Sequence, residues 1–442
     1  MLKITAKEGF TFCDGMSRRG MLKVGVLGLG GMTLPDLLRL RAHATSSPSP
    51  SAETAVVFIE LAGGPTHFET YDPKPDAPID FRGPLGAIST SVAGVAFSET
   101  MRHQAKVMDK MAVIRSIHHD SSSHSTSSHL TQTGYYLRDR QGRQNDMPSV
   151  GSISAKVRGA NASGVPAYVS VPSGTRFGNA AYIGKEFNPL ETGGDPNRSN
   201  FEVKNLSLNP ALDLARLEDR RGLLASLNHY RRVVDLDGTA KAYDGYEVQA
   251  FEMVTGERAR QAFDIGQEPD SVRDRYGRTT EGQSALLARR LVEAGVTFVT
   301  IRSAGWDMHG NVKAAIQRTG AAYDQAAGTL IADLHERGLA RNVLVVATGE
   351  FGRTPRINKN AGRDHWGSVM SVMLAGGAFQ MGQAIGASSP KGEVPADLPY
   401  RPENVLATIY RHLGIDPSLT FPDLSGRPRY VLEERRLIEE LL

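Results

Sequence analysis

Short, nearly uninterrupted apolar runs recur along the chain without the polar–apolar alternation of a half-exposed strand. The clearest are residues 55–61, 296–302 and 343–347. Runs of this kind are typical of strands buried on both faces of a parallel sheet. Between them lie longer segments whose apolar residues recur at helical spacing. The pattern therefore predicts an α/β fold with a mostly parallel central sheet sandwiched between helices.

Further elements complete the predicted domain, residues 55–442. We expect additional strands at residues 111–115, 167–171 and 371–374, and helices at residues 97–108, 283–294, 312–338 and 404–413. Residues from about 172 to 285 combine Gly-, Pro- and Asn-rich stretches with leucines at helical spacing. This composition indicates a loop-rich and helical insertion in the domain.

Acidic and imidazole side chains follow two of the buried runs. They are Asp307 and His309 after residues 296–302, and Glu350, Asp364 and His365 after residues 343–347. Ligands of open α/β sheets bind just beyond the carboxyl ends of the strands, so we expect these side chains to share one edge. Asp, Glu and His without Cys suit Zn²⁺, Mn²⁺, Fe²⁺ or Ca²⁺, and the imidazoles favour the transition metals.

A segment rich in histidine and serine, residues 116–134, follows the strand predicted at 111–115. It contains four histidines and seven serines. Hydroxyl-rich sequence that enters a helix can hold an anion, because the N-terminal amides and the helix dipole favour negative charge. The candidate residues are Ser123, His124, Ser125 and His129. The alternative is a solvated serine-rich loop with incidental histidines.

The first buried run ends in Gly63-Gly64-Pro65, a turn that lets the backbone approach a ligand closely. His67 follows as a candidate anion-binding residue, with Glu69 and Asp72 nearby. Asp72 precedes a proline and is also explained as a simple turn former.

Charge and cysteine content exclude several classes of function. Residues 1–44 hold seven Lys and Arg against three Asp and Glu, which leaves 44 basic and 45 acidic residues in the rest of the chain. This balance gives no electrostatic case for nucleic-acid binding. The only cysteine is Cys13, so cysteine nucleophiles, disulfides and cysteine-ligated metals are excluded from the mature domain.

The N-terminus has the pattern of an export signal. Residues 17–23, SRRGMLK, have the twin-arginine form, a weakly apolar run follows, and Ala42-His43-Ala44 resembles a cleavage site. We expect residues 1–44 to be a signal read by the twin-arginine export machinery and residues 45–54 to be a spacer. The mature protein would be periplasmic or extracellular, without a stable membrane span. An uncleaved anchor is the alternative, although the apolar run is short and Gly-rich for a span.

Three stretches of the sequence resemble the domain-of-unknown-function 1501 family, of the alkaline phosphatase-like superfamily that includes sulfatases. They are GGPTHFETYDPKP at residues 63–75, GWDMHGN at 305–311, and GEFGRTP followed by GRDHWG within 349–367. The resemblance implies metal ligands at strand ends: Asp307, His309, Glu350, and His365 together with Asp364. It also implies a nucleophile-bearing helix from His124 to Gly134.

Two departures from the superfamily pattern affect the expected chemistry. His124 stands at the nucleophile position instead of Ser, Thr or Cys. Gly63-Gly64 and Phe351 replace residues that help to hold a second ion. A second ion would therefore need His67, Glu69 or Asp72, or would be absent.

The sequence thus predicts an exported, metal-dependent hydrolase of phosphate or sulfate esters in small molecules or polysaccharides. His124 would attack the ester or act as a general acid, with Ser125 as the alternative nucleophile. Arg353 would hold the anion, together with the serine-rich helix start. The competing hypothesis is a non-catalytic exported protein that binds a metal or a polysaccharide on the same fold.

Overall fold

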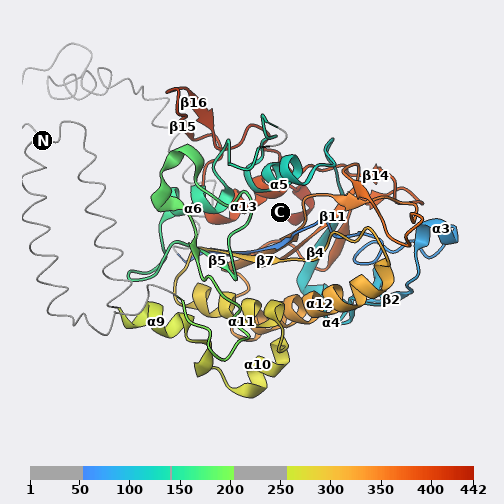
Figure 1. Ribbon diagram of the computed structural model, residues 1–442, viewed down its shortest axis with the longest axis horizontal. Helices are drawn as coiled ribbons and strands as arrows, with labels where there is room; N and C mark the ends of the chain where they lie inside the picture. The colour runs from blue at the N-terminus through green and yellow to red at the C-terminus, as the bar shows by residue number, and fades with distance from the viewer. Residues whose placement is uncertain (1–52, 140–141, 204–255) are drawn as a thin grey trace, which may run out of the picture. The chain divides into compact units, whose positions relative to one another are not determined.

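The computed structural model describes residues 53–139, 142–203 and 256–442 (Figure 1). The predicted signal, most of the predicted spacer, and residues 204–255 of the predicted insertion lie outside the described residues.

The core is an eight-stranded sheet in the order β12-β4-β11-β8-β1-β7-β5-β6. The central strand β1 pairs in parallel with β7 and β8, and β5 and β6 continue in parallel beyond β7. Within this sheet β11 runs antiparallel to both of its neighbours, β8 and β4. The predicted mostly parallel sheet is confirmed. Its strands are β1 (Ala55–Leu61), β4 (Met111–Ile117), β5 (Tyr168–Val171), β6 (Leu190–Glu191), β7 (Phe298–Ser303), β8 (Val343–Thr348), β11 (Met370–Gly376) and β12 (Gln383–Ile385).

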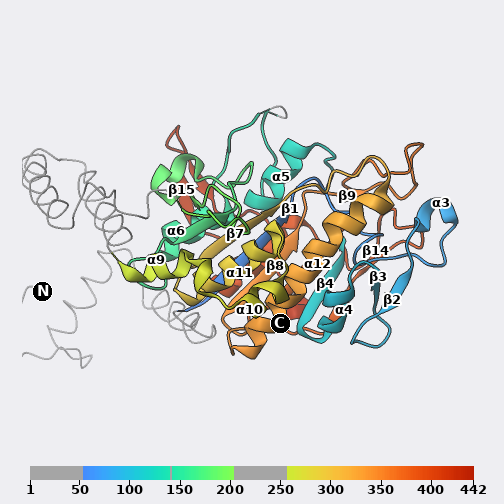
Figure 2. The same ribbon diagram turned by 60° about the horizontal axis from the view of Figure 1, so that its bottom comes forward.

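Helices cover both faces of the sheet, as Figure 1 shows. Helices α9 to α12 lie on one face, where Figure 2 shows α11 and α12 crossing the strands, and α5, α6 and α13 lie on the other. Within the described part of the chain, the α-helices are α3 (Ile79–Arg82), α4 (Arg102–Lys106), α5 (His124–Thr133), α6 (Val150–Arg158), α9 (Glu257–Phe263), α10 (Asp270–Tyr276), α11 (Thr280–Glu293), α12 (Val312–Glu336) and α13 (Pro402–Leu413).

Strand β1 shows why the strand sequences lack polar–apolar alternation. Val57 and Ile59 pack into the core under α11 and α12, whereas Val56 and Phe58 pack into the core on the opposite face. All seven residues of the strand are buried. Each large apolar side chain buried in this way contributes about 1.5–3 kcal/mol, so both faces of the strand stabilise the sheet.

In the described residues, four two-stranded ribbons lie outside the main sheet: β2 (Ala87–Ser89) with β3 (Ala96–Ser98), β9 (Gly352–Arg353) with β10 (His365–Trp366), β13 (Ala387–Ser388) with β14 (Pro395–Asp397), and β15 (Thr420–Pro422) with β16 (Pro428–Tyr430). The β9–β10 ribbon pairs His365 with Arg353. It thereby joins two of the motifs noted in the sequence.

The prediction of a helix over residues 97–108 is wrong for the first half of that range. Phe97 and Ser98 belong to β3, and the helix α4 covers only Arg102–Lys106. The ring of Phe97 is fully buried edge-on against Tyr71, and the Ser98 amide donates to the carbonyl of Thr70. These tertiary contacts override the local helical pattern.

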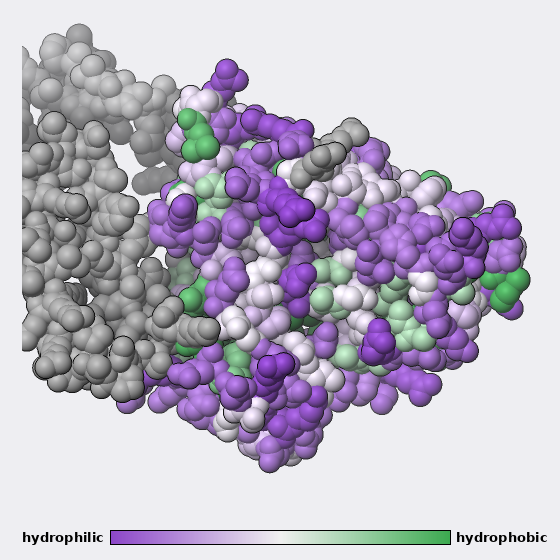
Figure 3. All heavy atoms as spheres, in the orientation of Figure 1, coloured by the Kyte–Doolittle hydropathy of each residue, from purple (hydrophilic) through white to green (hydrophobic). Residues whose placement is uncertain are grey.

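The described surface is mainly hydrophilic on the face in Figure 3, with small and separate hydrophobic patches. In the described ranges, no helix combines the length and apolar character needed to cross a bilayer.

Candidate metal centre

The structure gathers six of the predicted site residues at the carboxyl edge of the sheet. Asp307 and His309 follow β7, Glu350 follows β8, His365 lies in β10 beside Asp364, and His124 is the first residue of α5. Parallel strands end at the same edge, so these side chains meet although they are far apart in sequence.

Three ligand-type atoms form a compact triangle at the centre of this group. The Asp307 Oδ1, His309 Nε2 and His365 Nε2 atoms lie 3.0 Å from one another. Ligands of a tetrahedral Zn²⁺ ion, with bonds of about 2.0–2.1 Å, stand about 3.3 Å apart. The triangle therefore fits one face of a metal coordination shell, and its residues are partly exposed to solvent.

His124 extends the group at the second oxygen of Asp307, with its ring centroid 4.4 Å from that of His365. Its Nε2 lies 3.3 Å from Asp307 Oδ2, and its Nδ1 lies 2.6 Å from Glu350 Oε1. His124, Asp307 and His365 each offer a ligand atom, and these atoms lie within 4.8 Å of one another. Asp307 thus faces His124 with one oxygen and the two other histidines with its second oxygen.

Arg353 holds Asp307 in place and does not reach the surface. Its side chain is 0% exposed. The guanidinium donates to Asp307 Oδ1 at 2.5 Å, to Gly64 O at 2.9 Å, to Arg363 O at 3.0 Å and also to Gly63 O. The prediction that Arg353 binds the substrate anion is therefore corrected: its donors are occupied within the protein.

Charge and burial together set the protonation of the centre. Partial burial alone would raise the pKa of Asp307, but hydrogen bonds from Arg353 and His365 hold it well below its usual range. The Glu350 hydrogen bond raises the pKa of His124 against the effect of burial. Burial lowers the pKa of His365, with Asp307 opposing the shift. The Asp307 carboxylate is therefore ionised, and the lowered pKa of His365 favours its neutral form, as metal ligation requires. His124, whose pKa is raised, would release a proton on binding an ion.

Glu350 is fixed by a backbone amide and by an imidazole side chain, which the sequence only partly indicated. The Gly63 amide donates to both of its carboxylate oxygens, at 3.0 and 3.1 Å, and His119 Nε2 lies 2.7 Å from its carbonyl oxygen. Gly63 has φ +120°, and a Cβ there would lie 2.4 Å from the Asp307 amide nitrogen. The glycine is thus required for this close approach.

His309 is oriented by a carboxylate in the outer part of the centre. Its Nδ1 lies 2.7 Å from Asp364 Oδ1, and this hydrogen bond lowers the pKa of Asp364. Asn358 donates to the same oxygen at 3.1 Å and to His309 O at 3.0 Å. A carboxylate on the far nitrogen of a histidine is the usual support of a metal ligand. Asn358 carries no motif and was not predicted.

His67 and His129 do not reach this group, which corrects their predicted role in anion binding. His67 is 1% exposed, and its Nε2 bonds to the carbonyl of Gly392 at 3.1 Å. His129 is fully buried, with Nδ1 2.7 Å from Tyr135 O and Nε2 accepting from the amide of Asp146. Both side chains serve the packing of neighbouring loops.

The residues considered for a second ion are also occupied elsewhere. Glu69 forms a buried ion pair with Arg363 at 2.9 Å. Asp72 accepts from Lys74 at 2.9 Å and from the hydroxyl of Ser388 at 2.5 Å. Neither carboxylate adds a ligand to the centre.

The two candidate serines lie at the start of α5. Ser123 is exposed and precedes the helix without a side-chain capping bond. Ser125 is partly exposed, and its hydroxyl accepts from Arg176 Nη1 at 3.2 Å.

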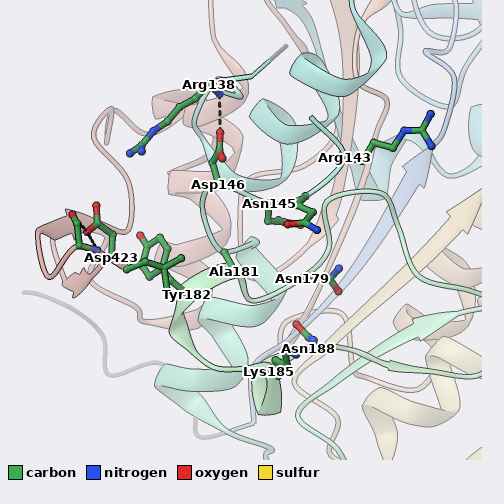
Figure 4. A pocket seen from close by; sticks show the side chains of 13 residues that line it. Arg138, Arg143, Asn145, Asp146, Asn179, Ala181, Tyr182, Lys185, Asn188 and Asp423 are labelled. Atoms are coloured by element: carbon green, nitrogen blue, oxygen red, sulfur yellow. Dashed lines mark hydrogen bonds between the residues drawn. The ribbon is translucent and has the colours of Figure 1, made fainter. Parts of the chain in front are cut away.

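A cavity of about 570 Å³ lies apart from the centre, between the loop around Asp146, the turn around Tyr182 and the β15–β16 hairpin (Figure 4). None of the residues of the centre lines it. Figure 4 shows Arg138 and Arg143 pointing away from each other. These two guanidinium groups therefore do not converge on one bound group.

The fold and the centre define an α/β protein with a cluster of His and Asp at the carboxyl edge of its sheet. The chain belongs to the family described as protein of unknown function DUF1501, whose model matches residues 53–442. No curated protein shows a significant match.

Several solved structures show distant similarity. A sulfatase from a Pseudoalteromonas species has 15% identity over 82% of this chain and 68% of its own, with a TM-score of 0.38. The alkaline phosphatase of the Antarctic bacterium TAB5 has 11% identity over 77% and 95%, with a TM-score of 0.34. A structure described under the metabolism of glycosaminoglycans by Bacteroides thetaiotaomicron has 10% identity over 82% and 73%, with a TM-score of 0.39.

Proposed function

We propose that the protein is an exported hydrolase that uses a divalent metal ion to cleave phosphate or sulfate esters. The observation that carries this proposal is the triangle of Asp307, His309 and His365 at the carboxyl edge of the sheet. Three imidazoles and a carboxylate, counting His124, favour Zn²⁺, Mn²⁺ or Fe²⁺ over Ca²⁺. The bound ion would neutralise the ester anion and lower the pKa of an attacking water molecule.

The side chains of the centre have separate tasks in this proposal. Asp307, His365, His309 and His124 hold the ion, and Arg353 keeps the Asp307 carboxylate ionised and fixed. His124 is a ligand in this account rather than a nucleophile, because both of its ring nitrogens already face carboxylates. Glu350 orients His124, and Asp364 orients His309. Ser125 remains the alternative nucleophile, since it follows His124 and is partly exposed.

Turnover after metal removal and readdition tests the proposal. The chelated protein should be inactive towards p-nitrophenyl phosphate and p-nitrophenyl sulfate, and Zn²⁺ or Mn²⁺ should restore hydrolysis of at least one of them. The Asp307→Ala variant should lose about 10²-fold or more in kcat/KM, whereas Asp397→Ala, at an exposed position in β14, should not. Hydrolysis that survives complete metal removal would contradict the proposal. Metal binding without turnover of any ester would favour the binding protein on the same fold.

A further inference from the structure

Two arginines lie beside the metal-ligand group without taking part in it. Arg176 follows β5, and its Nη1 donates to Ser125 Oγ at 3.2 Å. Ser125 is the residue after His124, so Arg176 reaches the same helix start as the metal centre. The second arginine, Arg302, lies in β7, the strand that leads to Asp307.

The register of the sheet places Arg302 on the face covered by α5. Arg302 is paired with Glu60 of β1, and Glu60 Oε1 accepts from Gln132 of α5 at 2.8 Å. Neighbouring residues in register on adjacent strands point to the same face. The side chains of Arg302 and Glu60 therefore both lie on the α5 side of the sheet. Arg176 also acts electrostatically on Glu60, so both guanidinium groups lie near this carboxyl group.

Arg302 lacks the partner that a half-buried guanidinium normally has. It makes no hydrogen bond or ion pair within residues 53–139, 142–203 and 256–442. Burial raises the pKa of Glu60 to about 8, although the charges of Arg302 and Arg176 oppose the shift. Glu60 directs its Oε1 to Gln132 and makes no hydrogen bond or ion pair with either arginine. A partly desolvated charge without a partner is costly, and arginine matches the planar faces of carboxylate, phosphate and sulfate.

We propose that Arg302 and Arg176 form a subsite for a second anionic group of the substrate, a sulfate, phosphate or carboxylate beside the ester that is cleaved. The inference rests on the proposed function, because it names the class of substrate: a multiply charged ester, such as a polyanionic saccharide. The reacting group would occupy the metal centre, whose own arginine, Arg353, is buried and already bonded. The subsite lies towards β5, and adjacent strands are about 5 Å apart. Two neighbouring charged groups of one substrate can therefore occupy the metal centre and the subsite together.

Binding of two matched probes tests the subsite. Titration calorimetry of the mature, metal-loaded protein would compare a disaccharide carrying two sulfonate groups, which mimic sulfate but cannot be hydrolysed, with the same disaccharide carrying one. The wild-type protein should bind the disulfonated probe about tenfold more tightly, since a charge-assisted bidentate contact is added. In Arg302→Gln this ratio should fall close to one, with unchanged metal content and melting temperature. Arg176→Gln, at an exposed position, should lower the ratio as well.

The control is Arg341→Gln, an exposed arginine just before the amino end of β8, at the opposite edge of the sheet. It should keep the wild-type ratio. An unchanged ratio in Arg302→Gln, or no preference in the wild-type protein, would overturn the subsite. Binding is measured without turnover. A protein that hydrolyses no ester, but whose preference still depends on Arg302, would therefore contradict the proposed hydrolase activity and support the subsite.

Discussion

The Nε2 atoms of His309 and His365 lie 3.0 Å apart, although the two residues are separated by 56 positions in the chain. Two imidazoles at this distance cannot both be protonated without strong repulsion. Asp307 Oδ1 lies 3.0 Å from each of them, so three atoms that can ligate a metal ion converge on one small volume. A shared cation would bind all three together, and this relationship underlies the proposed metal centre.

Gly63→Ala should disturb the centre through the backbone. The new Cβ would lie 2.4 Å from the Asp307 amide nitrogen and 2.8 Å from the carbonyl carbon of Trp306. We expect metal affinity to fall by at least tenfold and the melting temperature to drop. Gly94→Ala is the matched control, because Gly94 has φ +79° but nothing within 4 Å of an added Cβ. It should cost about 1 kcal/mol of backbone strain and leave metal binding intact. Equal metal affinity in the two variants would refute the close-approach argument.

Glu69→Ala should destabilise the protein strongly. Glu69 and Arg363 are 1% and 0% exposed, and their Oε1 and Nη2 atoms lie 2.9 Å apart. Removing one partner leaves an uncompensated buried charge, which costs about 3–5 kcal/mol. Chemical denaturation would measure this loss against Asp80→Ala, which breaks an exposed ion pair with Arg356 and should cost at most about 1 kcal/mol. A loss no larger than that of the control would contradict the assignment.

His67 should make stability depend on pH below neutrality. Burial lowers its pKa from 6.5 to about 4 in the folded protein. Above pH 6.5 the imidazole is neutral in both states and the full stability is present. As the pH falls from 6.5 towards 4, the unfolded chain binds a proton that the folded protein does not, and stability is lost by up to about 1.4 kcal/mol per pH unit.

His67→Gln removes this contribution. Over the same pH range, its free energy of unfolding should fall by about 2–3 kcal/mol less than that of the wild-type protein, whatever the absolute stability of the variant. Denaturation curves at pH 7, 5.5 and 4.5 would show this. Parallel pH profiles for the two proteins would mean that the folded state protonates His67 normally.

The sequence identified the strand ends well because local patterns encode them. Asp307, His309, Glu350, Asp364 and His365 each follow a buried apolar run, and the rule that strand ends meet at one edge was enough to group them. Their roles as ligands stay a prediction. His124 was found from the serine-rich entry to α5.

Other features depend on contacts between distant segments and leave no local signal. The bond of His67 to Gly392 spans 325 positions, and the contact of Arg353 with Gly64 spans 289. A histidine or arginine looks the same in the sequence whether its donors meet a ligand or a backbone carbonyl. The lack of a hydrogen-bond partner for Arg302 is likewise a property of the folded sheet, where its register neighbour Glu60 bonds to Gln132 instead.

The metal content of the protein decides whether Asp307, His309 and His365 hold an ion. The mature protein, purified without chelator, would be measured by plasma mass spectrometry beside Asp307→Ala and the control Asp397→Ala. We predict about one equivalent of a transition metal in the wild-type protein and the control, and less than a tenth of that in Asp307→Ala. A wild-type protein that holds no metal and takes up none on titration would contradict the account.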